Sequence, residues 1–287
     1  WIRKLKVKLS DVLVCAEHTG IYGYDLQIWL DDMQISFAFV SALEIKRSLG
    51  IRRGKNDAVD ALRIAEYAYI RRESISLSHK PSDVIFQLRA LLGERKQYVR
   101  MRAALLARKD ALHQYESKES IYRREEIIDK YAEYIASVDK QMRGLMEHDD
   151  EIKRNYELIS SVKGIGLVNA INTLVYTNNF TSFQTPRQYA CYCGIAPFEH
   201  TSGTSIKGRT AVSKMGNQQL KCELTMAARS AIIHDPWMKQ YYKRKMMSKG
   251  NAPGAHGIVL NAIKFKLIVR MFSVVKSGIP YKVMAYC

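Results

Sequence analysis

The stretch "VLVCAEHTGIYGYDLQIWLDDMQISFAFVSA", residues 12–42, determines the expected fold of the first part of the chain. It opens with a short apolar run of strand character at 12–17, and "TGIYG" follows as a turn. Apolar residues then recur at helical spacing, and 35–42 returns to a strand. A second helix is expected in "RRGKNDAVDALRIAEYAYIRR", residues 52–72. Strand, helix, strand, helix predicts a parallel sheet with functional groups at its strand ends.

The charge of the chain indicates a polyanionic partner. Lys and Arg number 45 against 28 Asp and Glu in 287 residues, a formal charge of +17. Such a field attracts nucleic acid first and an anionic membrane surface second, and it repels basic partners. Since no run of eighteen apolar residues occurs, we expect a cytoplasmic chain with no membrane partner.

Residues from about 82 to 155 have a different composition, without Pro and rich in Arg, Lys, Glu and Leu. Apolar residues recur at steps of three and four, which predicts long helices that can form an antiparallel hairpin with a turn near "YESKES", 115–120. The basic residues of the first helix fit a solvated face, a surface that follows a nucleic-acid backbone, or an oligomerisation arm.

Beyond residue 156 the chain is typical of a second globular domain. "LISSVKGIGLVNAINTLVY", residues 158–176, resembles a helix-hairpin-helix, in which a turn directs backbone N–H groups at a phosphate. Gly164 and Gly166 permit close approach because they have no Cβ, and Lys163 adds a cation. On its own this Gly-x-Gly turn is a weak signal.

Three carboxylates are candidate ligands for a cation. Asp57 and Asp60 share one face of the first turn of a predicted helix, where acids also commonly complement the helix dipole. Glu17 ends a strand that we expect to be buried, where an isolated charge is costly. Oxygen ligands of this kind select Mg²⁺ or Mn²⁺, which hold phosphate oxygens during strand transfer.

The polar stretch "HTSGTSIKGRTAVSKMGN", residues 200–217, cannot form a core. Its glycines leave the hydroxyl of Ser202 accessible, and Lys207, Arg209 and Lys214 are close enough in sequence to hold a phosphodiester. No obligate base for the serine is visible, and His200 is no more than a candidate. From spacing alone, a phosphate-binding or flexible loop is favoured over a catalytic serine.

Five motifs, in order and spacing, resemble the insertion-sequence-110 transposases and the related Piv-type DNA invertases. Their likeness runs over nearly the whole chain, which makes it far more specific than any one of them. The motifs are "CAEHTGIYGYDLQIWL", "RRGKNDAVDALRIAEYA", "SVKGIGLVNAINTL", "YACYCGIAPFEHTSGTSIKGR" and "VSKMGNQQLKCELTMAA".

This resemblance implies an α/β plus all-α fold. It implies a partial RuvC-like (RNase H-like) α/β domain at 1–78, a long helical coiled-coil linker at 79–155, and a mostly helical C-terminal transposase domain with the serine motif at 156–287. The family's metal-binding glutamate falls on Glu17, and two of its aspartates fall on Asp57 and Asp60. Its first aspartate belongs to an earlier strand, so we expect a chain that lacks its N-terminal strands.

The resemblance also implies the chemistry. Ser202, the serine of the family's "S-G" motif, is expected to form a covalent link to DNA while the acids hold Mg²⁺ near the same junction. It further implies a dimer or tetramer that works in the prokaryotic cytoplasm and is associated with the nucleoid. The expected guide is a structured bridge RNA. Two alternatives stay open from the residues: a RuvC-like nuclease that uses metal-activated water, and a basic nucleic-acid-binding remnant without catalysis.

Overall fold

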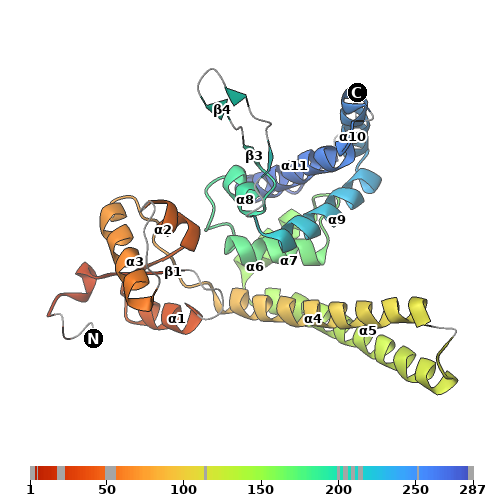
Figure 1. The fold of residues 1–287 in the computed structure, drawn as a ribbon, viewed down its shortest axis with the longest axis horizontal. Coiled ribbons are helices and arrows are strands. Elements are labelled where there is room, and N and C mark those ends of the chain that lie inside the picture. The colour runs from red at the N-terminus through yellow and green to blue at the C-terminus, as the bar shows by residue number, and fades with distance from the viewer. Residues whose placement is uncertain are drawn as a thin grey trace. The chain divides into compact units, whose positions relative to one another are not determined.

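The computed structural model describes residues 4, 6–17, 23–48, 56–112, 115–198, 201–202, 206–207, 211–212, 216–250 and 252–283 (Figure 1). The chain divides into two compact units, Trp1–Pro81 and Ser82–Cys287. The second unit includes residues 82–155 of the segment predicted as a linker and the whole segment predicted as the C-terminal domain. The limits of the three domains stay a prediction.

The first unit contains the expected strand, helix, strand, helix sequence. Strand β1 (Leu13–Glu17) pairs in parallel with β2 (Ser36–Val40), with Leu13 opposite Ser36 and Glu17 opposite Val40. Helix α1 (Tyr24–Asp32) lies between them in the chain, and α2 (Ala42–Ser48) and α3 (Asp57–Arg71) follow. The prediction of parallel strands is confirmed for this pair.

Successive side chains of β2 point to opposite faces of the sheet, and each face packs against a different helix. Ala38 and Val40 pack with Tyr67 of α3, and half-buried Cys15 joins them. Phe37 packs on the other face with Leu30 of α1. This period of two is what a sheet covered on both faces requires.

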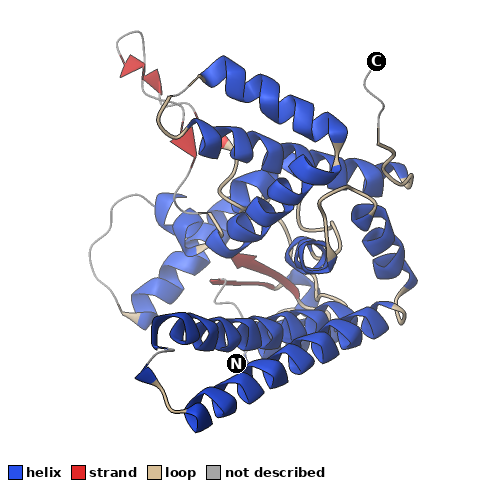
Figure 2. Cartoon of the chain, turned by 90° about the vertical axis from the view of Figure 1, so that its right-hand side faces the viewer, coloured by secondary structure: helices blue, strands red, loops and turns tan. Residues whose placement is uncertain are grey.

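The predicted helical hairpin opens the second unit. Helix α4 (Asp83–Leu112) packs along α5 (Lys118–Met146), and Figure 2 shows the two long helices side by side. The hydroxyl of Ser117 accepts a hydrogen bond from the N–H of Ser120, which caps the start of α5 within the expected turn. The first turns of α4 and the end of α5 contribute Leu88, Met142 and other residues to the main core.

The rest of the second unit is mostly helical, as expected. Its helices are α6 (Asp150–Ser160), α7 (Leu167–Thr177), α8 (Pro186–Tyr192), α9 (Gln218–His234), α10 (Pro236–Lys249) and α11 (Ala255–Ser277). They enclose one core built largely from Ile, Leu, Ala and Met side chains. The described strands of the whole chain form only two-stranded sheets, so the RuvC-like assignment rests on the resemblance alone.

Candidate functional site

Ser202 lies in a β-hairpin, which we call the serine arm (residues 197–212). Strand β3 (Pro197–Phe198) pairs with β6 (Ala211–Val212), and β4 (Thr201–Ser202) pairs with β5 (Ile206–Lys207), both antiparallel. Ser202 stands opposite Ile206, in the second of the two pairs of the β4–β5 ladder. Figure 1 shows β3 and β4 leading away from α8. The sequence predicted only a loop here, because strands of two residues leave no alternating pattern.

Two glycines close the base of the serine arm. A Cβ added to Gly216 would lie 2.2 Å from both the Cα and the N of Gly194, so the two backbones touch. The N–H of Asn217 donates to the carbonyl of Tyr192 at 2.8 Å. From α11, the side-chain amide of Asn261 donates to the carbonyl of Ile195 at 2.6 Å. The arm therefore leaves the helical body at a defined point.

Replacing Gly216 with alanine is expected to open this base and to lower the free energy of unfolding by about 1–3 kcal/mol, the range for overpacking. The cause is the overlap of the new Cβ with the backbone of Gly194. Thermal unfolding followed by circular dichroism measures it. Gly144→Ala, inside α5 with no atom within 4 Å of the added carbon, is the control and should be neutral or stabilising. Equal stability of the two variants would contradict the close contact.

The cations predicted to hold phosphate are only partly described. Lys207 stands opposite Thr201 in the arm, which places its backbone beside that of Ser202. Arg209 and Lys214 lie outside the described residues, as do the side chains of Ser202 and Lys207. Their role as phosphate contacts stays a prediction.

The sequence pattern did not predict a buried lysine in the second unit. Lys264 of α11 is only 6% exposed and donates to the hydroxyl of Thr225 on α9 at 3.1 Å. Burial lowers its pKa, and the charge of Lys221 lowers it further. The burial of Lys264 could have been inferred from helical spacing, because Lys264 lies between Leu260 and Leu267 on the core-facing side of α11.

The Gly-x-Gly turn has a packing function at its first glycine. Gly164 has φ +97°, and an added Cβ would come within 2.6 Å of the carbonyl oxygen of Ala227 on α9. Gly166 precedes α7 as its N-cap and is exposed, with no atom near an added Cβ. Lys163 is also exposed. Of the predicted phosphate contacts in this turn, Lys163 and Gly166 are thus accessible, whereas Gly164 is explained by its contact with α9.

The three predicted metal ligands lie on β1 and α3, which pack against each other. Glu17 ends β1 with an exposed side chain, so the expectation that it ends a buried strand is wrong. Asp57 begins α3, and Asp60 pairs with Arg63 at 3.1 Å. The side chain of Asn56 caps the helix by accepting from the N–H of Val59. Both aspartates therefore also suit a helix N-terminus without a metal.

Carboxylate oxygens suit Mg²⁺ or Mn²⁺, so the donor chemistry of these residues fits the predicted ion. The described part of the chain, however, contains no group of three or more His, Cys, Asp or Glu side chains placed to hold a metal. Among the described helices, none is both long and apolar enough to cross a membrane.

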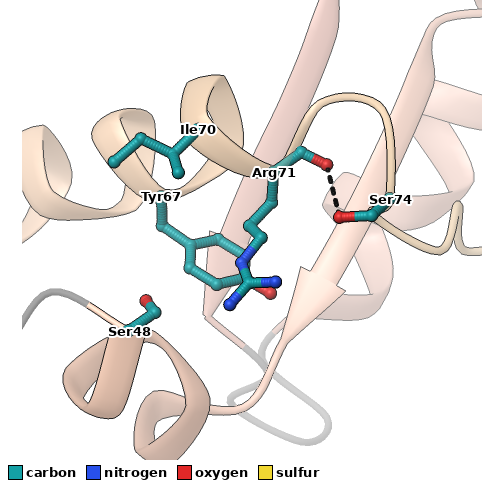
Figure 3. Close-up of a pocket in the computed structure, with 5 residues that line it drawn as sticks. All are labelled: Ser48, Tyr67, Ile70, Arg71 and Ser74. Carbon is teal, nitrogen blue, oxygen red and sulfur yellow. Dashed lines mark hydrogen bonds between the residues drawn. The ribbon is translucent and has the colours of Figure 1, made fainter.

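The first unit also has a small pocket between α2 and α3. It has a volume of about 210 Å³ and is lined by Ser48, Tyr67, Ile70, Arg71 and Ser74 (Figure 3). The hydroxyl of Tyr67 donates to Glu44 at 2.7 Å, and burial together with this carboxylate raises the pKa of Tyr67 to about 12. Since Tyr67 stays protonated at neutral pH, this bond links α3 to α2 and supplies no base.

Comparisons with known proteins match both units. Residues 156–243 match the "Transposase IS116/IS110/IS902 family", and residues 1–115 match a DEDD transposase model of the IS110 type. The pilin gene-inverting proteins of Moraxella bovis and Moraxella lacunata are each 27% identical over 284 residues, which cover 98% of this chain and 85% of theirs. An uncharacterized 43.6 kDa protein of insertion element IS110 from Streptomyces coelicolor is 29% identical over 159 residues, 54% of this chain and 38% of its own.

The two family models describe different parts of one kind of protein, and they occur here in one chain with the serine arm in the second matched part. The alignments with the pilin gene-inverting proteins cover 98% of this chain and so include both matched parts. The chain belongs to the IS110 family of transposases.

Proposed function

We propose that this transposase cleaves and rejoins DNA through the hydroxyl of Ser202. In the first step the serine oxygen bonds to phosphorus, and the bond from phosphorus to one sugar oxygen breaks. The serine proton passes through a base or solvent to the departing sugar hydroxyl. Because a phosphodiester is replaced by another phosphodiester, a second sugar hydroxyl can reverse the step and join the strand to a new end.

The serine arm is the observation that supports this role most directly. Ser202 lies in the second of two short antiparallel ladders, and Gly194 and Gly216 fix the base of the arm. Lys207 belongs to the same ladder. We propose that Lys207, Arg209 and Lys214 offset the negative charge that develops on the non-bridging oxygens. We also propose Lys163 and the N–H groups around Gly164 and Gly166 as contacts to the DNA backbone.

We further propose that Glu17, Asp57 and Asp60 hold a divalent ion, Mg²⁺ or Mn²⁺. Alternation along β1 puts Glu17 on the same face as Cys15, which packs near Ile64 of α3. Asp60 is one helical turn from Ile64 and shares its face. When bound, the ion supplies charge stabilisation for phosphate oxygens. The carboxylates bind and orient it, and Arg63 must release Asp60 to allow this.

Separate Asp57→Ala and Asp60→Ala variants are expected to lose metal-dependent strand cleavage by about 100-fold or more. Loss of a residue that only orients a metal ligand already lowers metal affinity or activity by about 10–100-fold. Cleavage of supercoiled DNA is measured across a Mg²⁺ and Mn²⁺ titration. Asp31→Ala, an exposed acid on α1, is the matched control and should retain cleavage. Unchanged turnover in either variant would exclude that aspartate as a ligand.

A structured guide RNA and a dimer or tetramer complete the proposal. A protein that leaves sequence choice to base pairing needs mainly basic surface that follows a backbone, and the charge of +17 supports this. We propose that Ser202 of one subunit works with acids of another. Sequence-specific cleavage that survives complete removal of RNA by ribonuclease would contradict the guide.

A further inference from the structure

Helix α10 combines five basic side chains with three aromatic residues, two of which stack on each other. Within its 14 residues it carries no acid, and its basic side chains are Lys239, Lys243, Arg244, Lys245 and Lys249. One turn apart on the same helix, Trp237 and Tyr241 stack with ring centroids 5.4 Å apart and planes inclined by 6°. Both rings are half-buried against α11. No motif in the sequence marks this helix as a binding site.

Four cations converge on these two rings. The ammonium of Lys266, from α11, lies 5.0 Å from the centroid of Trp237 and 4.7 Å from that of Tyr241. Arg270, one turn further along α11, lies 4.9 Å from Trp237. Arg244 and Lys245 of α10 lie 5.7 and 5.8 Å from Tyr241. We call this group of four cations and two rings the cation–aromatic face.

The positive charge of this face is poorly compensated. Arg270 pairs with Asp235, whereas Lys266, Arg244 and Lys245 have no carboxylate within ion-pair distance among the described residues. The pKa of Lys266 is lowered by burial and, beyond that, by Arg270, Arg244 and Lys245. Holding like charges together costs free energy, which a bound anion recovers. The face is thus arranged for an anionic ligand.

We propose that the cation–aromatic face binds the phosphodiester backbone of duplex DNA through residues other than those assigned to the reaction. Cations lie over both aromatic rings, so an unpaired base cannot stack on them. The face therefore recognises phosphate charge and not base sequence. Phosphates repeated along a strand match the basic side chains repeated along α10. This inference deepens the proposed function, because it assigns a DNA contact for the same recombinase.

The test is the salt dependence of DNA binding by the full chain in EDTA, so that no cleavage occurs. A Lys266→Met/Arg244→Gln double variant removes two charges and keeps much of both side-chain stems. The slope of log affinity against log salt should become shallower by about 1.8, at about 0.9 per phosphate contact. Lys130→Met/Lys153→Met, which removes two lysines already paired with glutamates, is the matched control and should keep the slope.

Two binding results would overturn the proposal, and thermal unfolding checks that the variant is folded. An unchanged slope in the Lys266→Met/Arg244→Gln variant would overturn the proposal, and so would a shallower slope with single-stranded RNA but not with duplex DNA. Thermal unfolding should be unchanged or shifted upward, since the variant relieves repulsion. Failure of the proposed serine chemistry would leave these binding measurements intact, so the two proposals fail separately.

Discussion

Ser202→Ala is expected to abolish covalent protein–DNA adducts, lowering strand cleavage by on the order of 10³-fold or more, the scale seen when a covalent nucleophile is lost. The affinity for DNA should stay within a few-fold of the unmodified chain, because a neutral hydroxyl contributes little to a contact dominated by phosphate charge. Adducts are trapped by denaturation during the reaction and resolved by electrophoresis, and binding is measured in parallel by fluorescence anisotropy.

Thr201→Ala is the matched control for this experiment. Thr201 is the other residue of β4, so its substitution also removes one hydroxyl from this strand and leaves Ser202 in place. It should retain adducts. If the Ser202→Ala variant still formed adducts, another nucleophile would be responsible. If the unmodified chain cut DNA and left only free ends, the nuclease alternative would replace the serine mechanism.

In the first unit, the sequence predicted the type and order of β1, α1 and β2 correctly, but not the exposure of Glu17. Two short apolar runs predicted β1 and β2, and the polar and apolar spacing between them predicted α1, because each pattern has a distinct period. The burial of Glu17 was predicted wrongly. A run of apolar letters does not reveal where a strand leaves the core, and β1 becomes exposed at its last residue.

The serine arm could not be predicted as a hairpin for a different reason. Its ladders contain two pairs each, and backbone pairing of that length leaves no side-chain period to detect. What fixes the arm is contact between residues that are distant in sequence, such as Gly194 with Gly216 and Asn261 with Ile195. Glycine in the sequence indicates freedom of the backbone, but only the fold shows which glycines touch.

The cation–aromatic face was missed because its members come from two helices. Lys266 and Arg270 are ordinary charged residues in the pattern of α11, and Trp237 and Tyr241 fit the apolar spacing of α10. Only the packing of α10 on α11 brings the cations over the rings. The serine and acid motifs could be named as candidates from the sequence because each lies in a short segment, whereas a surface formed by distant segments leaves no such local pattern.

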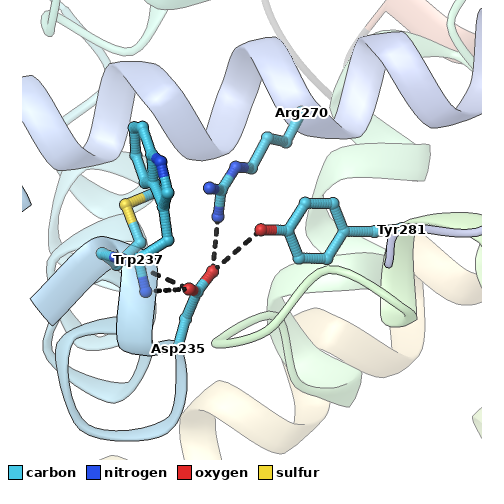
Figure 4. A network of polar contacts seen from close by, with 5 residues as sticks. Asp235, Trp237, Arg270 and Tyr281 are labelled. Atoms are coloured by element: carbon cyan, nitrogen blue, oxygen red, sulfur yellow. Dashed lines mark hydrogen bonds and ion pairs between the residues drawn. The ribbon is translucent and has the colours of Figure 1, made fainter. Parts of the chain in front are cut away.

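Asp235→Ala is expected to cause the largest loss of stability, about 3–5 kcal/mol, the range for removing one partner of a buried ion pair. Asp235 is fully buried, and its Oδ2 accepts from Arg270 at 2.6 Å and from the hydroxyl of Tyr281 at 3.1 Å (Figure 4). Its Oδ1 accepts from the N–H groups of Trp237 and Met238 and so caps α10. Denaturant unfolding followed by circular dichroism measures the loss.

A comparison with Asp149 separates the stability contributed by the helix cap of Asp235 from that contributed by its ion pair. Asp149 caps α6 by accepting from the N–H groups of Glu151 and Ile152, but it makes no ion pair with a described residue. Asp149→Ala should therefore cost only about 1 kcal/mol, the typical value of an N-cap. If Asp235→Ala cost no more than this, the charge of Arg270, whose side chain is 14% exposed, would be solvated in the variant, and the cap alone would account for the effect of Asp235.

The pair can be tested once more by removing both charges. Arg270→Met in the Asp235→Ala background deletes the guanidinium that the first substitution leaves unpaired. Part of the lost stability should return, because an unpaired buried charge costs more than the neutral side chain that replaces it. Recovery would assign the large effect to desolvated charge, whereas strictly additive losses would assign it to the cap and to the packing of Arg270 between Trp237 and Tyr281.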